Sequence, residues 1–390
     1  MANLPTTLVY DPITFKGGSK IATSDALNLC TVNKQHFLVI SADTGYWQQT
    51  EFYQRHQPTL IKLPMAALLT RHHNGIMYWL EQWLTALIVL FFISRSKCVT
   101  QLLGASGPGI DMALYLVQKL LGLPVIQWVH GNVGLSRSIG YCLTKADAVF
   151  FLPSTETSIR NAIEHYFKAK TNIADSQAIS THFISASHYH VTINGLAQSR
   201  WPSRSQTDFP IGLWAASLLK WKGLDTLVEA VKYGQKVRPL ALNICFIRPN
   251  NTRLPVSNAP VNLLHTQWHQ DPDNLDEIRA QSNIFISTSH NEPFGLSILE
   301  ALAAGMCVVI PSDGSYWDQV LTHNENCVKY QPGDANSLCD ALLYAFSERD
   351  VMQACSRKAH KVSQTYRADI QYQKFVHCIS GTAPAQLTSV

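Results

Sequence analysis

The chain has 390 residues, of which 46% are hydrophobic and 15% are charged, so it has enough apolar material for two or three packed domains. Its formal net charge of +4 is too small for a typical nucleic-acid-binding protein, although it would suit an anionic ligand or an anionic membrane surface. The nine cysteines stand singly, which is typical of reduced, buried thiols in a cytosolic protein and argues against a disulfide framework or a cysteine zinc site.

The first half of the chain alternates short apolar strands with helical stretches, which indicates parallel strands joined by right-handed crossovers. We expect no signal peptide, because residues 1–10 lack a charged start and a long apolar run. Residues 169–188 are polar and poorly patterned. The expected strands are 7–10, 36–41, 98–103, 125–129, 148–152 and 189–193, with helices ending near 29 and 120 and another after 157.

Residues 76–93 form the longest apolar stretch, about the length of a short membrane-spanning helix. Glu81 and Gln82 interrupt it, so that only residues 84–93 are continuously apolar. A helix buried against a sheet is the favoured interpretation, a helix dipping into a membrane is the second, and a true span is the third.

Residues 197–210 are rich in Ser, Arg and Pro and predict a linker, after which the α/β pattern restarts. We expect an N-terminal domain over 1–200, a C-terminal domain over 207–365, and a segment over 366–390 that returns to the first domain. Ligands of such folds bind beyond the carboxyl ends of the strands. The expected strands of the second half are 211–216, 240–247, 262–265, 283–288 and 306–310, with helices at 223–232, 294–304, 335–347 and 351–365.

The most informative segment is 287–305, where a strand is followed by a short loop and a helix start. The unpaired N–H groups at a helix start bind anions, and Gly295 leaves room for a close approach. Glu292 lies in the loop, and Glu300 lies two helical turns further on, so the pair can grip sugar hydroxyls. Taken alone, Glu292 would be interpreted as a helix-start carboxylate and Glu300 as a solvated helix residue, but the pair around Pro-Phe-Gly favours a binding site.

Three further positions are weaker candidates for binding or catalysis. Lys222 precedes a helix start and can reach a diphosphate, although a lone lysine is more often solvated. His130 follows a strand and precedes a glycine, which makes a functional and a structural role about equally supported. Gly17 and Gly18 open the first helix, but they lack the G-x-G-x-x-G and G-K-[ST] patterns of nicotinamide and P-loop sites.

The spacing Glu292-x7-Glu300 around Pro-Phe-Gly-Leu, followed by Glu-Ala-Leu-Ala-Ala-Gly and a buried strand, resembles the signature of glycosyltransferase family 4. The Lys222-Gly223 stretch and the order of Gly17-Gly18, His130-Gly131 and Asn194-Gly195 are similar to that family as well. The resemblance spans most of the chain and is strongest over 211–333. It implies the α/β GT-B fold, in which two Rossmann-like domains face each other across a cleft.

The resemblance also implies roles for individual residues. Glu292 would contact hydroxyls of the transferred sugar, and Glu300 would hold the ribose of the nucleotide. Lys222 would neutralise the leaving diphosphate, and His130 would orient the sugar, which makes Glu292, Lys222 and His130 the catalytic candidates. Gly18 would line the facing side of the cleft.

The remaining donor-binding candidates are the backbone N–H groups of Phe294, Gly295 and Leu296, together with Ser217. Ser217 stands where the family usually has an arginine, so a guanidinium fork on the diphosphate is lost. Lys220 or an arginine from elsewhere is the expected substitute. Without one, activity would be weak or absent.

The sequence thus predicts a retaining glycosyltransferase of hexosyltransferase type. It would move a sugar from a nucleotide-diphosphate-sugar to a glycan or lipid-linked acceptor, in cell-surface polysaccharide synthesis. The rival interpretations are a GT-B-fold sugar epimerase and a non-catalytic sugar-nucleotide binder, the latter suggested by Ser217. No cofactor, metal or nucleic acid is expected. The expected location is the cytoplasm, either free or peripheral on the inner face of the membrane.

Overall fold

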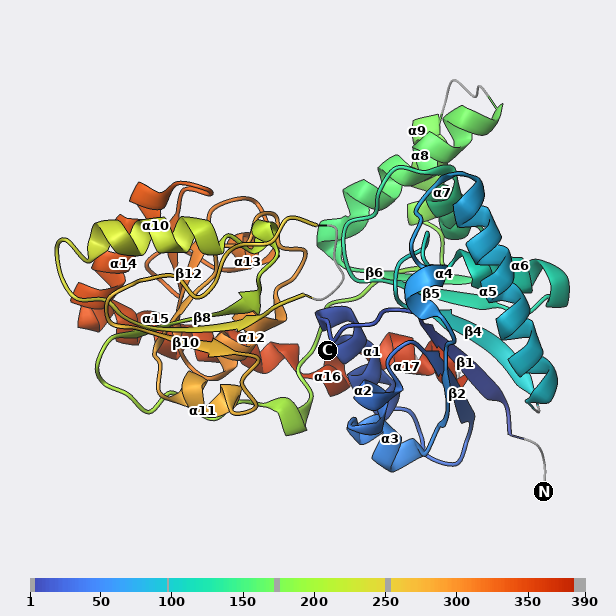
Figure 1. Cartoon of the computed structure of the whole chain (residues 1–390), viewed down its shortest axis with the longest axis horizontal. Coiled ribbons are helices and arrows are strands. Elements are labelled where there is room, and N and C mark those ends of the chain that lie inside the picture. Colours follow the sequence, from blue (N-terminus) through green and yellow to red (C-terminus); the bar gives the residue numbers. More distant parts are fainter. Residues whose placement is uncertain (1–3, 97, 172–175, 250–253, 382–390) are drawn as a thin grey trace, which may run out of the picture. The chain divides into compact units, whose positions relative to one another are not determined.

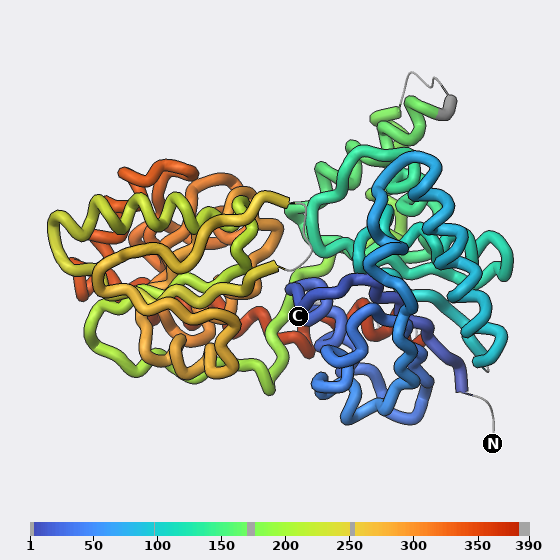
Figure 2. The backbone as a smooth tube through the Cα atoms, viewed as in Figure 1, coloured from blue at the N-terminus to red at the C-terminus, as the bar shows by residue number. Residues whose placement is uncertain are grey.

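The computed structural model describes residues 4–96, 98–171, 176–249 and 254–381, and it divides into two compact units (Figures 1 and 2). Unit 1 consists of Met1–Gly195 and Ala368–Val390, and unit 2 consists of Leu196–Arg367. The expected linker, 197–210, belongs to unit 2 and is not free. Its backbone N–H groups at Ser205 and Gln206 donate to the carbonyls of Ala304 and Ala280, at 2.9 and 2.8 Å.

Unit 1 is built on a seven-stranded parallel sheet in the order β3-β2-β1-β4-β5-β6-β7. The order reverses between β1 and β4, which is the topological switch point where ligands of doubly wound folds bind. The strands are β1 (Thr6–Asp11), β2 (His36–Ser41), β3 (Thr59–Lys62), β4 (Val99–Gly104), β5 (Val125–Val129), β6 (Ala148–Phe151) and β7 (Tyr189–Val191).

Both faces of this sheet are covered by helices, and β5 shows why its residues suit that position. All five of its residues are buried. Gln127 bonds to Tyr115 of α6 (Met112–Leu121), whereas Trp128 stacks on Phe375 of α17 (Gln373–Ser380), so alternate side chains enter opposite layers. The helices are α1 (Gly18–Asn28), α2 (Thr44–Gln48), α3 (Glu51–His56), α4 (Ala66–Leu69), α5 (Gly75–Arg95), α6 (Met112–Leu121), α7 (Arg137–Lys145), α8 (Glu156–Thr171), α9 (Ser176–Ile184), α16 (Ala368–Gln371) and α17 (Gln373–Ser380).

The C-terminal helices anchor to unit 1 through aromatic side chains. Trp128 contacts both Tyr372 and Phe375, with ring centroids 5.4 and 4.2 Å apart. The Tyr372 hydroxyl also donates to the Gly195 carbonyl at 3.2 Å. These contacts bury large apolar area on the sheet face opposite α6, and they account for the placement of residues 368–381 in unit 1.

Unit 2 contains a six-stranded parallel sheet in the order β10-β9-β8-β11-β12-β13. Its strands are β8 (Ile211–Ser217), β9 (Ala241–Ile247), β10 (Thr266–Gln270), β11 (Ile284–Ile286), β12 (Cys307–Pro311) and β13 (Val328–Tyr330). Its helices are α10 (Leu224–Gly234), α11 (Leu275–Ala280), α12 (Leu296–Ala303), α13 (Tyr316–Val320), α14 (Ala335–Ser347) and α15 (Arg349–Ser363).

The strand predictions failed at sheet edges. Residues 262–265 were predicted as a strand, but they precede β10, and β3 and β13 were not predicted at all. All three strands lie at the end of a sheet. An edge strand needs no continuous apolar run, because one side faces solvent, and β10 (TQWHQ) has none.

Two helical regions differ from the sequence analysis. The polar region 169–188, for which no element was predicted, contains α9 and the end of α8. The apolar stretch 76–93 is helical within α5, but it is not a buried helix, since only 28% of its apolar window is buried. Its buried residues follow one face, and large apolar side chains follow the other.

Candidate functional site

In unit 2, Lys222 and Glu292 form an ion pair beside the loop between β11 and α12. Lys222 Nζ lies 2.5 Å from Glu292 Oε2, and the two side chains are 18% and 14% exposed. The ammonium also lies 3.9 Å from the centre of the Trp221 ring. The structure therefore brings together two of the predicted catalytic residues, although they lie 70 positions apart.

Close packing of the glycine after Lys222 fixes this lysine. Gly223 has φ +73°, and an added Cβ would lie 2.0 Å from the Thr288 carbonyl oxygen, so only glycine fits. Thr288 Oγ1 donates to the Lys222 carbonyl at 2.8 Å and accepts from Trp214 Nε1 at 2.9 Å. The His290 N–H donates to the Trp221 carbonyl at 2.8 Å. These contacts clamp the lysine loop to the loop that carries Glu292.

The helix predicted to begin at Phe294 begins two residues later, at Leu296. Gly295, with φ +80°, is the N-cap of this helix, α12. Within the described residues, the N–H groups of Phe294, Gly295 and Leu296 have no protein acceptor. Phe294 is buried and anchors the loop against Tyr316 and Trp317, with ring centroids 4.9 and 5.3 Å apart. A rigid loop thus presents three free donors at the positive end of a helix dipole, which suits a phosphate.

Glu300 already has two cationic partners. Its Oε1 lies 2.6 Å from Arg200 and its Oε2 lies 2.7 Å from Arg279, which is itself largely buried. Each carboxylate oxygen still has a second lone pair, so a ribose diol can bind beside the arginines. Neither arginine was singled out from the sequence, since Arg200 is 100 positions from Glu300 and lies in the expected linker.

Lys220, the expected substitute for an arginine at position 217, has an acidic partner in this structure. Ser217 ends β8, and Lys220 Nζ pairs with Asp225 at 2.8 Å in an exposed contact. Lys222 is therefore the lysine of this loop that reaches Glu292. The contribution of Ser217 to donor binding stays a prediction.

In unit 1, His130 follows β5 and stacks on Trp128 at a centroid distance of 4.5 Å. Burial lowers its pKa to about 3, so the ring is neutral. Thr23 Oγ1 lies 3.2 Å from His130 Nε2, and the Thr23 hydroxyl donates to the Ser19 carbonyl at 2.8 Å. Because a hydroxyl has one proton, Nε2 must donate to Thr23. His130 Nδ1 is then a lone-pair acceptor, and it is buried with no protein partner among the described residues.

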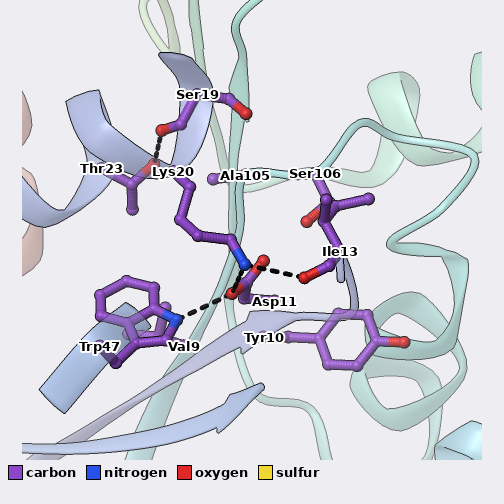
Figure 3. A pocket seen from close by; sticks show the side chains of 10 residues that line it. All are labelled: Val9, Tyr10, Asp11, Ile13, Ser19, Lys20, Thr23, Trp47, Ala105 and Ser106. Atoms are coloured by element: carbon purple, nitrogen blue, oxygen red, sulfur yellow. Dashed lines mark hydrogen bonds and ion pairs between the residues drawn. The ribbon is translucent and has the colours of Figure 1, made fainter. Parts of the chain in front are cut away.

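Gly18 is the exposed first residue of α1, and a buried cluster that the sequence did not reveal holds this turn in place. Lys20 Nζ lies 3.0 Å from Asp11 and donates to the Ile13 carbonyl at 2.8 Å (Figure 3). Asp11 Oδ2 also accepts from Trp47 Nε1 at 2.8 Å. The cluster ties the end of β1 to α1. The sequence could have indicated Asp11, because it ends a strand, but no sequence pattern pointed to Lys20 as its partner.

A second buried acid organises the neighbouring loop. Asp111 Oδ2 accepts from the N–H groups of Ser106 and Gly107, at 3.1 and 3.0 Å, and from Gln127. Burial raises the Asp111 pKa to about 7. An added Cβ at Gly104 would lie 2.8 Å from Asp111 Oδ2, so the glycine is required there. Asp111 is fully buried and supports the loop without contacting solvent.

In the part of the chain that the structure describes, no three His, Cys, Asp or Glu side chains gather as a metal site. The expectation that no metal or cofactor takes part stays a prediction.

Comparisons with known proteins bear on unit 2 first. Residues 197–362 match the family model for glycosyl transferases group 1. A sucrose-phosphate synthase from Zea mays is 35% identical over 74 residues, which is 19% of this chain and 7% of that protein. The chain therefore spans only a small part of this relative's length.

Solved structures resemble nearly the whole chain. The HepE protein of Anabaena, in complex with UDP and glucose, covers 97% of this chain and 100% of its own, with 14% identity and a TM-score of 0.68. A sucrose-phosphate synthase from Thermosynechococcus elongatus covers 97% and 99%, with 14% identity and a TM-score of 0.69. At this identity the likeness shows the fold, and the predicted GT-B fold of two Rossmann-like units is confirmed.

Proposed function

We propose that this protein is a glycosyltransferase that moves a sugar from a nucleotide-diphosphate-sugar to a glycan or lipid-linked acceptor, with retention of anomeric configuration. The observation that supports this most directly is the Lys222–Glu292 pair, whose glutamate lies in the same loop as the N–H groups of Phe294 and Gly295. Those two groups and the N–H of Leu296 have no protein acceptor among the described residues. This site lies in the segment that matches the group 1 glycosyl transferases. The similarity to family 4 supports retention and a hexosyl donor, and UDP in HepE makes uridine nucleotides the first donors to test.

The chemistry at this site is stabilisation of the leaving group. As the bond to the anomeric carbon breaks, negative charge develops on the β-phosphate. Lys222 Nζ and the N–H groups at the start of α12 are preorganised donors for that charge. Glu292 holds the ammonium in place before the donor binds and accepts from sugar hydroxyls afterwards. Glu300 accepts from the ribose.

The neutral His130 complements this role in unit 1. Its Nδ1 is a buried acceptor that has no protein partner among the described residues, and in this proposal a sugar hydroxyl donates to it once the bound donor has uncovered it. A charged histidine could not accept there, and the low pKa keeps the ring neutral across the physiological range. No cofactor or metal is required in this scheme, and synthesis of a cell-surface polysaccharide at the cytoplasmic side is the proposed setting.

A non-catalytic sugar-nucleotide binder is the second candidate, because Ser217 leaves the diphosphate with one fewer cation. The epimerase alternative requires acid/base carboxylates open to the substrate. The buried Asp111 has the raised pKa of such a group, but it contacts no solvent.

One experiment separates these functions. Purified protein is incubated with radiolabelled nucleotide-sugars, uridine donors first, and a lipid-linked acceptor. A transferase releases nucleoside diphosphate and labels the acceptor, whereas an epimerase converts the donor sugar without releasing the nucleotide. A binder retains the labelled donor unchanged. Either of the last two results would overturn the proposal.

A further inference from the structure

Helix α5 of unit 1 has two apolar faces, and only one packs against the protein. The packed face forms hydrogen bonds with α6 and the loop before it. The Tyr78 hydroxyl donates to the Gly109 carbonyl at 2.8 Å, and Gln82 Oε1 accepts from the Ala113 N–H at 3.0 Å. Its buried residues are Tyr78, Gln82, Thr85, Ala86 and Val89.

The opposite face exposes a continuous set of large apolar side chains. Leu80 is 58% exposed and Leu87 is 59% exposed, and positions 76, 80, 83, 87 and 91 recur at helical spacing. Two tryptophans belong to this set, and indole rings favour the boundary between water and lipid. We call it the α5 outer face, and it consists of Ile76, Met77, Trp79, Leu80, Trp83, Leu84, Leu87 and Phe91.

Neighbouring residues enlarge this face. Met65 and Leu68, at and within the short helix α4 that packs on α5, are 59% and 50% exposed. An apolar hollow of about 320 Å³ lies beside Phe91 and Pro64. A contiguous patch of this kind on a protein surface marks an interaction site.

The charges around the patch match an anionic partner. Between 62 and 121 the sequence has five Lys or Arg residues but only two acids, Glu81 and Asp111. Asp111 is buried, and Glu81 pairs with His72 at 2.5 Å. The Arg95 guanidinium lies over the Phe91 ring at 4.5 Å, so a cation borders the apolar face, and no acid among the described residues forms an ion pair with it.

A lipid surface fits these features better than a membrane span. Among the described residues, α5 is the one helix long and apolar enough to cross a bilayer. A span would, however, have to strip the hydrogen bonds of Tyr78 and Gln82 from α6 and place them in hydrocarbon. Lying in the bilayer surface keeps those bonds, buries the outer face and brings the flanking cations to the headgroups.

We infer that the α5 outer face docks this protein on an anionic lipid bilayer, with α5 parallel to the membrane surface. This inference concerns binding and does not depend on transferase activity. The two claims therefore fail separately.

Vesicle sedimentation tests it. The full-length protein should sediment with phosphatidylcholine vesicles that contain phosphatidylglycerol, more weakly with pure phosphatidylcholine, and less as salt rises. The double variant Leu80→Glu/Leu87→Glu should lose about tenfold or more of the binding, because two charges would enter the apolar boundary. Phe209→Glu in unit 2 is the matched control, since Phe209 is 79% exposed and lies outside the α5 outer face, and it should bind like the wild type.

A second measurement uses no charged substitution, so misfolding of the glutamate variant cannot account for its result. Brominated lipid should quench tryptophan emission of the wild type, and quenching should fall in Trp79→Phe/Trp83→Phe. Absence of vesicle binding, unchanged binding of the glutamate variant, or equal binding to neutral vesicles would overturn the inference. Resistance to extraction by alkaline carbonate would also overturn it, because that result indicates a membrane span. So would a protein that binds no lipid but forms a dimer, if Leu80→Glu/Leu87→Glu dissociates that dimer.

Discussion

Replacing Lys222 with alanine removes the ammonium that lies 2.5 Å from Glu292, in the loop that leads to α12. If this ammonium meets the leaving diphosphate, the variant loses one charged hydrogen bond, worth about 1.5–3 kcal/mol. That energy corresponds to a fall of about ten- to more than a hundredfold in rate. Because the phosphate charge grows as the bond breaks, the loss should lie mainly in kcat.

The same substitution leaves Glu292 without its cation. Both side chains are mostly buried, at 18% and 14% exposed, so removal of the cation should cost about 1–3 kcal/mol of the stability of unit 2. The variant should therefore remain folded, which circular dichroism and a urea titration will check. Activity and stability can then be separated.

Steady-state kinetics of sugar transfer provides the assay, and Lys220→Ala provides the control. Lys220 belongs to the same 3-10 turn, Lys220–Lys222, but its pair with Asp225 is exposed at 53% and 51%. The control should keep wild-type kinetics. Ser217→Arg should raise activity or partly rescue Lys222→Ala, because it restores a guanidinium at the strand end. A Lys222→Ala enzyme with near wild-type kcat would refute the assignment.

Three further predictions follow from side-chain partners. Glu300→Ala should weaken nucleotide-sugar binding by about 1.5–3 kcal/mol and lower the free energy of unfolding, because Arg279 loses a buried partner; unchanged donor affinity by calorimetry would reject the ribose role. In Thr23→Val, His130 should no longer be held in the Nε2–H tautomer, which its ¹⁵N chemical shifts will show, and sugar transfer should fall. Thr23→Ser should keep the tautomer and the activity of the wild type. An unchanged tautomer in the valine variant would disprove the hydrogen-bond assignment. Asp111 has its folded-state pKa raised from 3.8 to about 7, so wild-type stability should fall by up to about 4 kcal/mol as pH rises from 4 to 7, whereas Asp111→Asn should not show this fall; urea midpoints with the same pH dependence in both proteins would contradict it.

The sequence carried the parts of the fold that rest on local patterns. Central strands such as β5 and β12 are continuous apolar runs, so they could be found without tertiary information. The Glu292-x7-Glu300 block could be placed on a loop and the helix after it, because its turn residues and its apolar helix face agree. Three of the four edge strands gave no such pattern, and β10 was misplaced by several residues, whereas the edge strand β7 lies within the predicted range 189–193.

Partners distant in the chain were beyond such patterns. Glu300 meets Arg200 from 100 positions away, and His130 meets Thr23 from 107 positions away. Neither pair has a spacing that a helix or a turn imposes. The exposed outer face of α5 was only the second interpretation of residues 76–93, since a largely apolar helix has the same sequence pattern whether neighbours cover one face or both.

The central claim is that Lys222 and the start of α12 hold the diphosphate of a nucleotide-sugar. Calorimetric titration of nucleoside diphosphates tests this claim without knowledge of the sugar or the acceptor. The wild type and Lys220→Ala should each bind one molecule of a nucleoside diphosphate with equal affinity, and Lys222→Ala should bind it about tenfold or more weakly. Absence of binding by the wild type, or equal affinity in Lys222→Ala, would contradict the account.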